Sequence, residues 1–139
     1  MTSEEMLELS DACWEALNAR DWDSYFEWVA PDLVTRTDPR WPDGGEFRGR
    51  EQIMRFMEAF LDPWESLRYE RRAGPERVGD RMMEEGSWLG TGRSTGIDGR
   101  IDFTVVGEFR GKLVSRLEFF LSHEEALDYL RTGERPSTD

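Results

Sequence analysis

Hydrophobic positions in the first half of the chain recur at the three- and four-residue spacing of amphipathic helices. The first apolar stripe consists of Met6, Leu9, Cys13 and Leu17. It predicts a helix over about residues 3–20, after which Asp21 is the N-cap of a second, short helix that Pro31 ends. A third stripe, the most regular in the chain, predicts a helix that begins after Gly49 and ends at Pro63.

The rest of the chain has the period of two that is typical of β-strands. The β-branched residues over 33–38 predict a short strand. Because side chains of a strand alternate between its two faces, Val34, Arg36 and Asp38 share one face. Four further strands are predicted over residues 64–73, 78–92, 100–109 and 112–121. Glycine-containing turn signals join these four strands, and the first of them is Gly74-Pro75.

A last short helix is predicted after Ser122, which has the capping-box spacing to Glu125, and Gly133 ends this helix. The order of elements predicts an α+β fold in which helices cover one face of a strongly curved antiparallel sheet. Such a sheet leaves a conical hollow, the usual form of a small-molecule pocket. We expect one domain over residues 1–135 and a loose C-terminal tail over residues 136–139.

Charge and composition narrow the possible partners. The chain has 139 residues with 30 acidic and 18 basic side chains, and its net charge of −12 argues against nucleic acid and anionic membranes as partners. The single cysteine, Cys13, and the single histidine exclude an internal disulfide and a structural zinc site. With no signal-like start and no long apolar run, we expect a cytoplasmic protein that uses no metal and no cofactor.

Four short segments carry a family resemblance, namely EALNARDW at 15–22, TDP at 37–39, FRGRE at 47–51 and EEAL at 124–127. With these four segments in this order along the chain, the sequence resembles the SnoaL-like branch of the nuclear transport factor 2-like superfamily. The resemblance implies a cystatin-like α+β barrel, a pocket for a small apolar molecule and a homodimer formed through the sheets. That superfamily contains ketosteroid isomerases and limonene-epoxide hydrolases, and also proteins that only bind or dimerise, so the fold leaves the function open.

Asp38 is the candidate catalytic residue. The pair Asp38-Pro39 resembles the Asp-Pro pair in which ketosteroid isomerases carry their general base, at the end of the first strand. Burial beside an apolar cavity would raise the pKa of this carboxyl and make it a better proton acceptor. The alternative is an Asp-Pro turn whose carboxylate caps the next backbone amides or pairs with Arg36 on the same strand face. The tyrosine and the protonated aspartate of those isomerases are missing, because Cys13 and Val105 stand at the matching positions.

The aromatic content suggests what would line the pocket. Besides Arg36, the candidate ligand-binding residues are Trp14, Tyr25, Trp41, Phe56, Trp88, Phe103 and Phe119. The alternative for most of them is a place in a filled core. Trp41 lies in a proline-rich loop and is the candidate lid or entrance. Glu84 shares a strand face with Trp88, where it is either a buried acid or an exposed sheet residue.

Two functional hypotheses follow. In the first, the protein binds a small apolar molecule and catalyses proton transfer, elimination or hydration with Asp38 as the base. In the second, the same fold is a non-catalytic binding or dimerisation module, with Asp38 held by Arg36 or by backbone amides.

Overall fold

The computed structural model describes residues 1–41 and 44–135. Its helices are α1 (Ser3–Asn18), α2 (Trp22–Glu27), α3 (Gly49–Leu61) and α4 (His123–Thr132). Side-chain caps begin three of them, because Thr2, Asp21 and Ser122 each accept a hydrogen bond from a backbone amide of the first turn. Among the described residues, no helix is long and apolar enough to cross a membrane.

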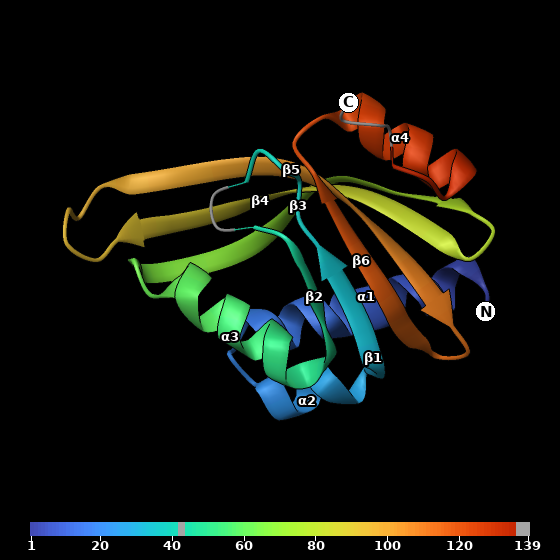
Figure 1. The fold of residues 1–139 in the computed structure, drawn as a ribbon, viewed down its shortest axis with the longest axis horizontal. Helices are drawn as coiled ribbons and strands as arrows, with labels where there is room; N and C mark the ends of the chain where they lie inside the picture. Colours follow the sequence, from blue (N-terminus) through green and yellow to red (C-terminus); the bar gives the residue numbers. More distant parts are fainter. Residues whose placement is uncertain (42–43, 136–139) are drawn as a thin grey trace.

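The strands form one six-stranded sheet in the order β2-β1-β6-β5-β4-β3, curved but not closed (Figure 1). They are β1 (Val29–Arg36), β2 (Glu46–Arg48), β3 (Trp64–Val78), β4 (Arg81–Gly92), β5 (Asp98–Arg110) and β6 (Leu113–Phe120). The predicted α+β class is confirmed. The sheet is mixed, however: β1 and β6 pair in parallel, and every other pair of neighbouring strands is antiparallel.

Two of the three prolines predicted to end an element, Pro31 and Pro75, instead lie inside a strand. The short helix α2 ends at Glu27, and Pro31 lies in β1 at an irregularity of its pairing with β6, where no ladder hydrogen bond is lost. Gly74-Pro75 does not reverse the chain, because β3 continues through it as an edge strand with a bulge. The reversal comes at Gly79, which has φ +60°.

Helices cover both faces of the sheet, and not one face as predicted (Figure 1). The main core packs α1, α2 and α3 against one face. On the opposite face α4 packs against β4, β5 and β6. That second, smaller cluster consists of Met83, Val106, Phe120, Ala126, Tyr129 and Leu130. We call these the inner face and the outer face, and strand alternation decides to which of them each side chain belongs.

Candidate functional site

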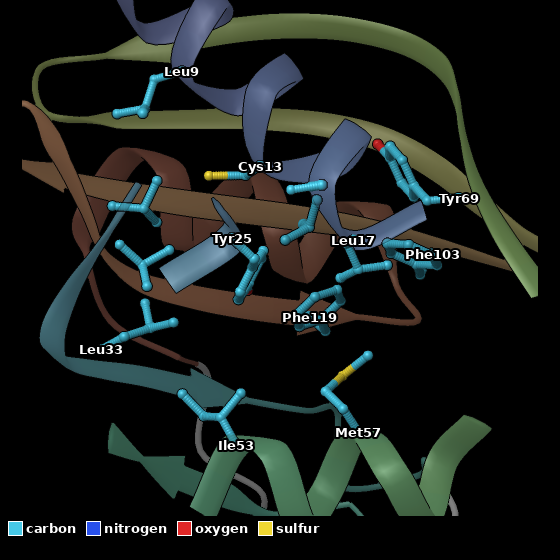
Figure 2. Close-up of a cluster of buried hydrophobic side chains, with 14 of the residues drawn as sticks. Leu9, Cys13, Leu17, Tyr25, Leu33, Ile53, Met57, Tyr69, Phe103 and Phe119 are labelled. Carbon is cyan, nitrogen blue, oxygen red and sulfur yellow. The ribbon is translucent and has the colours of Figure 1, made fainter. Parts of the chain in front are cut away.

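An internal cavity lies on the inner face, between the sheet and helices α1, α2 and α3. The cavity has a solvent-accessible volume of about 60 Å³. This is room for about four to six water molecules or for one small ring. Figure 2 shows how side chains of the three helices and of the sheet converge around this space, among them Cys13, Tyr25, Met57 and Phe119. Most of the wall is apolar, and Glu84 is its only charged side chain among the described residues.

Six of the eight predicted ligand-binding residues line the cavity. They are Trp14, Tyr25, Trp41, Phe56, Trp88 and Phe119. The other two do not reach it. Phe103 is a core residue, 2% exposed, whose ring lies between those of Trp88 and Phe119 at centroid distances of 5.9 and 5.4 Å. Arg36 lies on the outer face, where it binds Glu118.

Glu84 is buried, and all of its carboxylate is occupied by donors. Its Oε1 accepts hydrogen bonds from Ser10 Oγ at 2.8 Å and Trp14 Nε1 at 3.0 Å. Its Oε2 accepts from Tyr69 Oη at 2.7 Å and Arg71 Nε at 2.6 Å. Burial and the neighbouring carboxylate raise the pKa of Tyr69, so its hydroxyl stays protonated and donates. The network ties α1 to β3 and β4 and satisfies the buried charge.

Asp38 lies outside the cavity, and its side chain is fully buried. Its carboxylate accepts from Arg40 Nε and Nη2, both at 2.7 Å, and from the backbone amides of Arg40 at 2.9 Å and Leu121 at 2.8 Å. Burial favours the neutral acid, but these hydrogen bonds outweigh it and lower the pKa to about 2. The predicted raised pKa is therefore wrong, and Asp38 makes the capped turn that was its alternative.

Arg36 does not pair with Asp38 either. It binds Glu118 in a bidentate geometry, with Nε and Nη2 each 2.8 Å from a carboxylate oxygen. Arg116 and Arg135 reach the same carboxylate at 3.0 and 2.9 Å, and the Glu118 side chain is 0% exposed. Glu118 and its three partly buried arginines form an ionic cluster on the outer face, and none of the four lines the cavity.

Two threonines of the β1 segment line the cavity, and the sequence-based candidates did not include them. Thr35 and Thr37 alternate with Arg36 and Asp38 along the chain, so their side chains lie on the opposite, inner face. Thr37 Oγ1 accepts a hydrogen bond from the Gly45 amide at 2.7 Å. Thr35 Oγ1 is buried and has no hydrogen-bond partner among the described residues. The same alternation that grouped Arg36 with Asp38 could have identified both threonines.

An aromatic partition separates the cavity from an open surface groove, and it consists of Trp41, Phe56 and Phe60. All three residues line both spaces. The ring of Phe60 lies 5.8 Å from that of Trp41 and 6.0 Å from that of Phe56, centroid to centroid. Trp41 is only 7% exposed, so it is part of an internal wall, and its role as an entrance stays a prediction. Pro42 of the same predicted loop lies outside the described residues.

Cys13 also lines the cavity, but its thiol is not activated. Burial raises the pKa of Cys13 to about 12, which leaves almost no thiolate near neutral pH. Among residues 1–41 and 44–135, no group of acidic, histidine or cysteine side chains is placed to hold a metal ion. The cavity therefore offers a ligand an apolar surface with a few polar groups, and the one charged group among them, Glu84, already accepts four hydrogen bonds.

A curved mixed sheet that encloses an apolar cavity with three helices defines a protein of the nuclear transport factor 2-like class. The chain belongs to the SnoaL-like domain family, whose model matches residues 11–117. No curated protein matches the sequence.

Solved structures share the fold at low sequence identity. TerC, co-crystallised with polyporic acid, has a TM-score of 0.74 at 20% identity over 91% of this chain and 97% of its own. A protein of unknown function from Burkholderia pseudomallei has a TM-score of 0.74 at 18% identity, with 93% and 98% covered. An uncharacterised cystatin-fold protein from Novosphingobium aromaticivorans has a TM-score of 0.65 at 24% identity, with 82% and 96% covered.

Proposed function

We propose that this protein binds a small apolar molecule in the cavity between the sheet and helices α1, α2 and α3, and that it does so without acid–base catalysis. The observation that carries the proposal is the composition of the cavity wall. The wall is mostly aromatic and aliphatic, and the one carboxylate that the described part of the chain contributes to it, that of Glu84, already accepts four hydrogen bonds. Burial of apolar ligand surface is the interaction that such a wall provides.

The competing function is proton transfer, elimination or hydration with an acidic residue as the base. A general base needs a carboxylate within hydrogen-bond reach of the bound molecule. Asp38 does not line the cavity, and four donors hold its carboxylate on the other side of the strand. Its low pKa also makes it a weak proton acceptor. These observations favour binding over catalysis.

Similarity to solved structures agrees with a binding role. TerC, which shares the fold, was crystallised with an organic molecule, polyporic acid. At 20% identity this similarity supports only the use of the same fold for an organic ligand, not the same ligand.

The proposal is tested by titrating the protein with toluene and following tryptophan fluorescence and the melting temperature. We expect toluene to raise the melting temperature, because a ligand that binds only the folded state stabilises it by mass action. In a Gly107→Val variant the response should disappear. Gly107 lines the cavity, and an added Cβ would make only ordinary contacts, 3.6 Å from Phe109 and 3.7 Å from Leu117. The strand therefore has room for the added Cβ, and we expect the two methyl groups of valine to occupy space in the cavity.

Asp38→Asn is the matched control, because it removes a buried charge outside the cavity. It should respond to toluene as the wild type does at a temperature where both are folded. An unchanged response of Gly107→Val would refute the proposed site, and an absent response of the wild type would refute the proposed function.

Two further predictions from the sequence accompany this proposal, a cytoplasmic location and a homodimer through the sheets. Light scattering on the purified protein measures the mass in solution, and a value near the 16.3 kDa of one chain would refute the dimer.

A further inference from the structure

One polar atom of the cavity wall is both fully buried and without a hydrogen-bond partner among the described residues. Thr35 is 5% exposed, its side chain lines the cavity, and its Oγ1 has no hydrogen-bond partner among the described residues. A buried hydroxyl without a partner is unfavourable, so native proteins leave few of them. Such an atom at the wall of a pocket is therefore a candidate contact for a bound molecule.

The other polar groups of the wall have partners or carry no charge. Glu84 holds the hydroxyl of Ser10 and the indole N–H of Trp14. Thr37 Oγ1 accepts from the Gly45 amide. Burial raises the pKa of Tyr25, which keeps its hydroxyl neutral. Within residues 1–41 and 44–135 no arginine, lysine or histidine lines the cavity, so no cationic side chain of its wall would neutralise an anionic ligand.

From these groups we infer the chemical class of the ligand: a neutral, mainly apolar molecule that carries one oxygen group, a hydroxyl or a carbonyl, and hydrogen-bonds it to Thr35 Oγ1. This inference rests on the proposed binding function and adds its polar contact. A threonine hydroxyl both donates and accepts, so it can pair with either group. Charged relatives of the same molecule are excluded by the cost of burying an unpaired charge.

The inference is tested with three probes of one shape, namely toluene, p-cresol and p-toluate, against the wild type and two variants. Thr35→Val removes the hydroxyl and keeps the branched shape, while Thr35→Ser keeps the hydroxyl. Thr91→Val is the matched control, because Thr91 bonds Asp98 in an exposed hairpin and does not line the cavity. Dissociation constants come from tryptophan fluorescence.

The informative quantity is the ratio of the toluene and p-cresol dissociation constants. The cost of taking p-cresol out of water is the same for every variant, so it cancels when the ratios are compared. We expect Thr35→Val to lower the p-cresol preference about fivefold, the value of one neutral hydrogen bond. Thr35→Ser and Thr91→Val should keep the wild-type ratio, and p-toluate should bind at least about tenfold more weakly than p-cresol.

Each outcome decides a separate point. If toluene binds but the ratio is the same in wild type and Thr35→Val, the Thr35 contact is refuted while the binding function stands. If p-toluate binds as tightly as p-cresol, the neutral ligand class is refuted. If none of the three probes binds the wild type, the proposed function fails, and the inference fails with it.

Discussion

Replacing Asp38 by asparagine should destabilise the protein in a pH-dependent way. The hydrogen bonds from Arg40 and Leu121 lower the pKa of Asp38 from 3.8 to about 2. Because each pKa unit corresponds to about 1.4 kcal/mol, the folded state stabilises the charged carboxylate by about 2.5 kcal/mol relative to the unfolded chain. Arg40 is 56% exposed, and solvent screens part of this interaction. We therefore expect Asp38→Asn to lower the free energy of unfolding by about 1.5–2 kcal/mol near neutral pH.

The sign of the pH dependence follows from the lowered pKa. A carboxyl with a lower pKa in the folded state stabilises that state above its unfolded pKa, and the stabilisation is lost as the pH falls through the folded value. The difference between wild type and Asp38→Asn should therefore be constant above about pH 5 and shrink between about pH 4 and pH 2. Other acidic groups titrate in both proteins and cancel in the difference.

Urea unfolding followed by tryptophan fluorescence, repeated from pH 7 to pH 2.5, measures this difference directly. Asp23→Asn is the matched control, because Asp23 is 89% exposed in its ion pair with Arg50, and we expect its effect to be within about 0.5 kcal/mol. If Asp38→Asn is as stable as the wild type at pH 7, or differs from it equally at every pH, the capped-turn role of Asp38 is refuted.

Three other perturbations test separate parts of the structure. Thr35→Val should raise the stability of the ligand-free protein by about 1 kcal/mol in urea unfolding, because a buried hydroxyl without a partner is removed, and a loss of stability would contradict this. Glu118→Gln should destabilise by about 3 kcal/mol, because three guanidinium groups lose their shared anion, and a change below about 1 kcal/mol would show that the cluster is dispensable. Phe60→Ala removes one ring of the aromatic partition and should speed toluene association at least about threefold in stopped-flow fluorescence; an unchanged rate would place the entrance elsewhere.

Local sequence patterns predicted the elements well because they act over a few residues. The apolar stripes of α1 and α3 and the caps at Asp21, Ser122 and Gly133 all lie where the pattern placed them. No strand was predicted where β2 lies, and the predicted ends at Pro31 and at Gly74-Pro75 failed. There the partner strands accommodate the proline at an irregular pairing or at a sheet edge, which depends on neighbours distant in the sequence.

For the candidate site, the sequence could identify groups of residues but not the face of the sheet that each group occupies. Alternation placed Arg36 and Asp38 together, which is correct, but it could not tell that their face is turned away from the cavity. It also left the burial of Glu84 open, because its four donors come from α1 and β3, up to 74 residues away. The aromatic candidates fared better because most large aromatic residues are buried wherever the core lies.

The sequence by itself determined the class of the fold, the periodicity of nearly every element and the apolar, aromatic character of the interior, because these depend on local propensity and hydrophobic pattern. Only the tertiary structure decided the parallel pairing of β1 with β6, the placement of α4 on the outer face and the partners of each buried charge. These features depend on contacts between segments that are far apart in the chain. They place Thr35 in the wall of the cavity and Asp38 outside it.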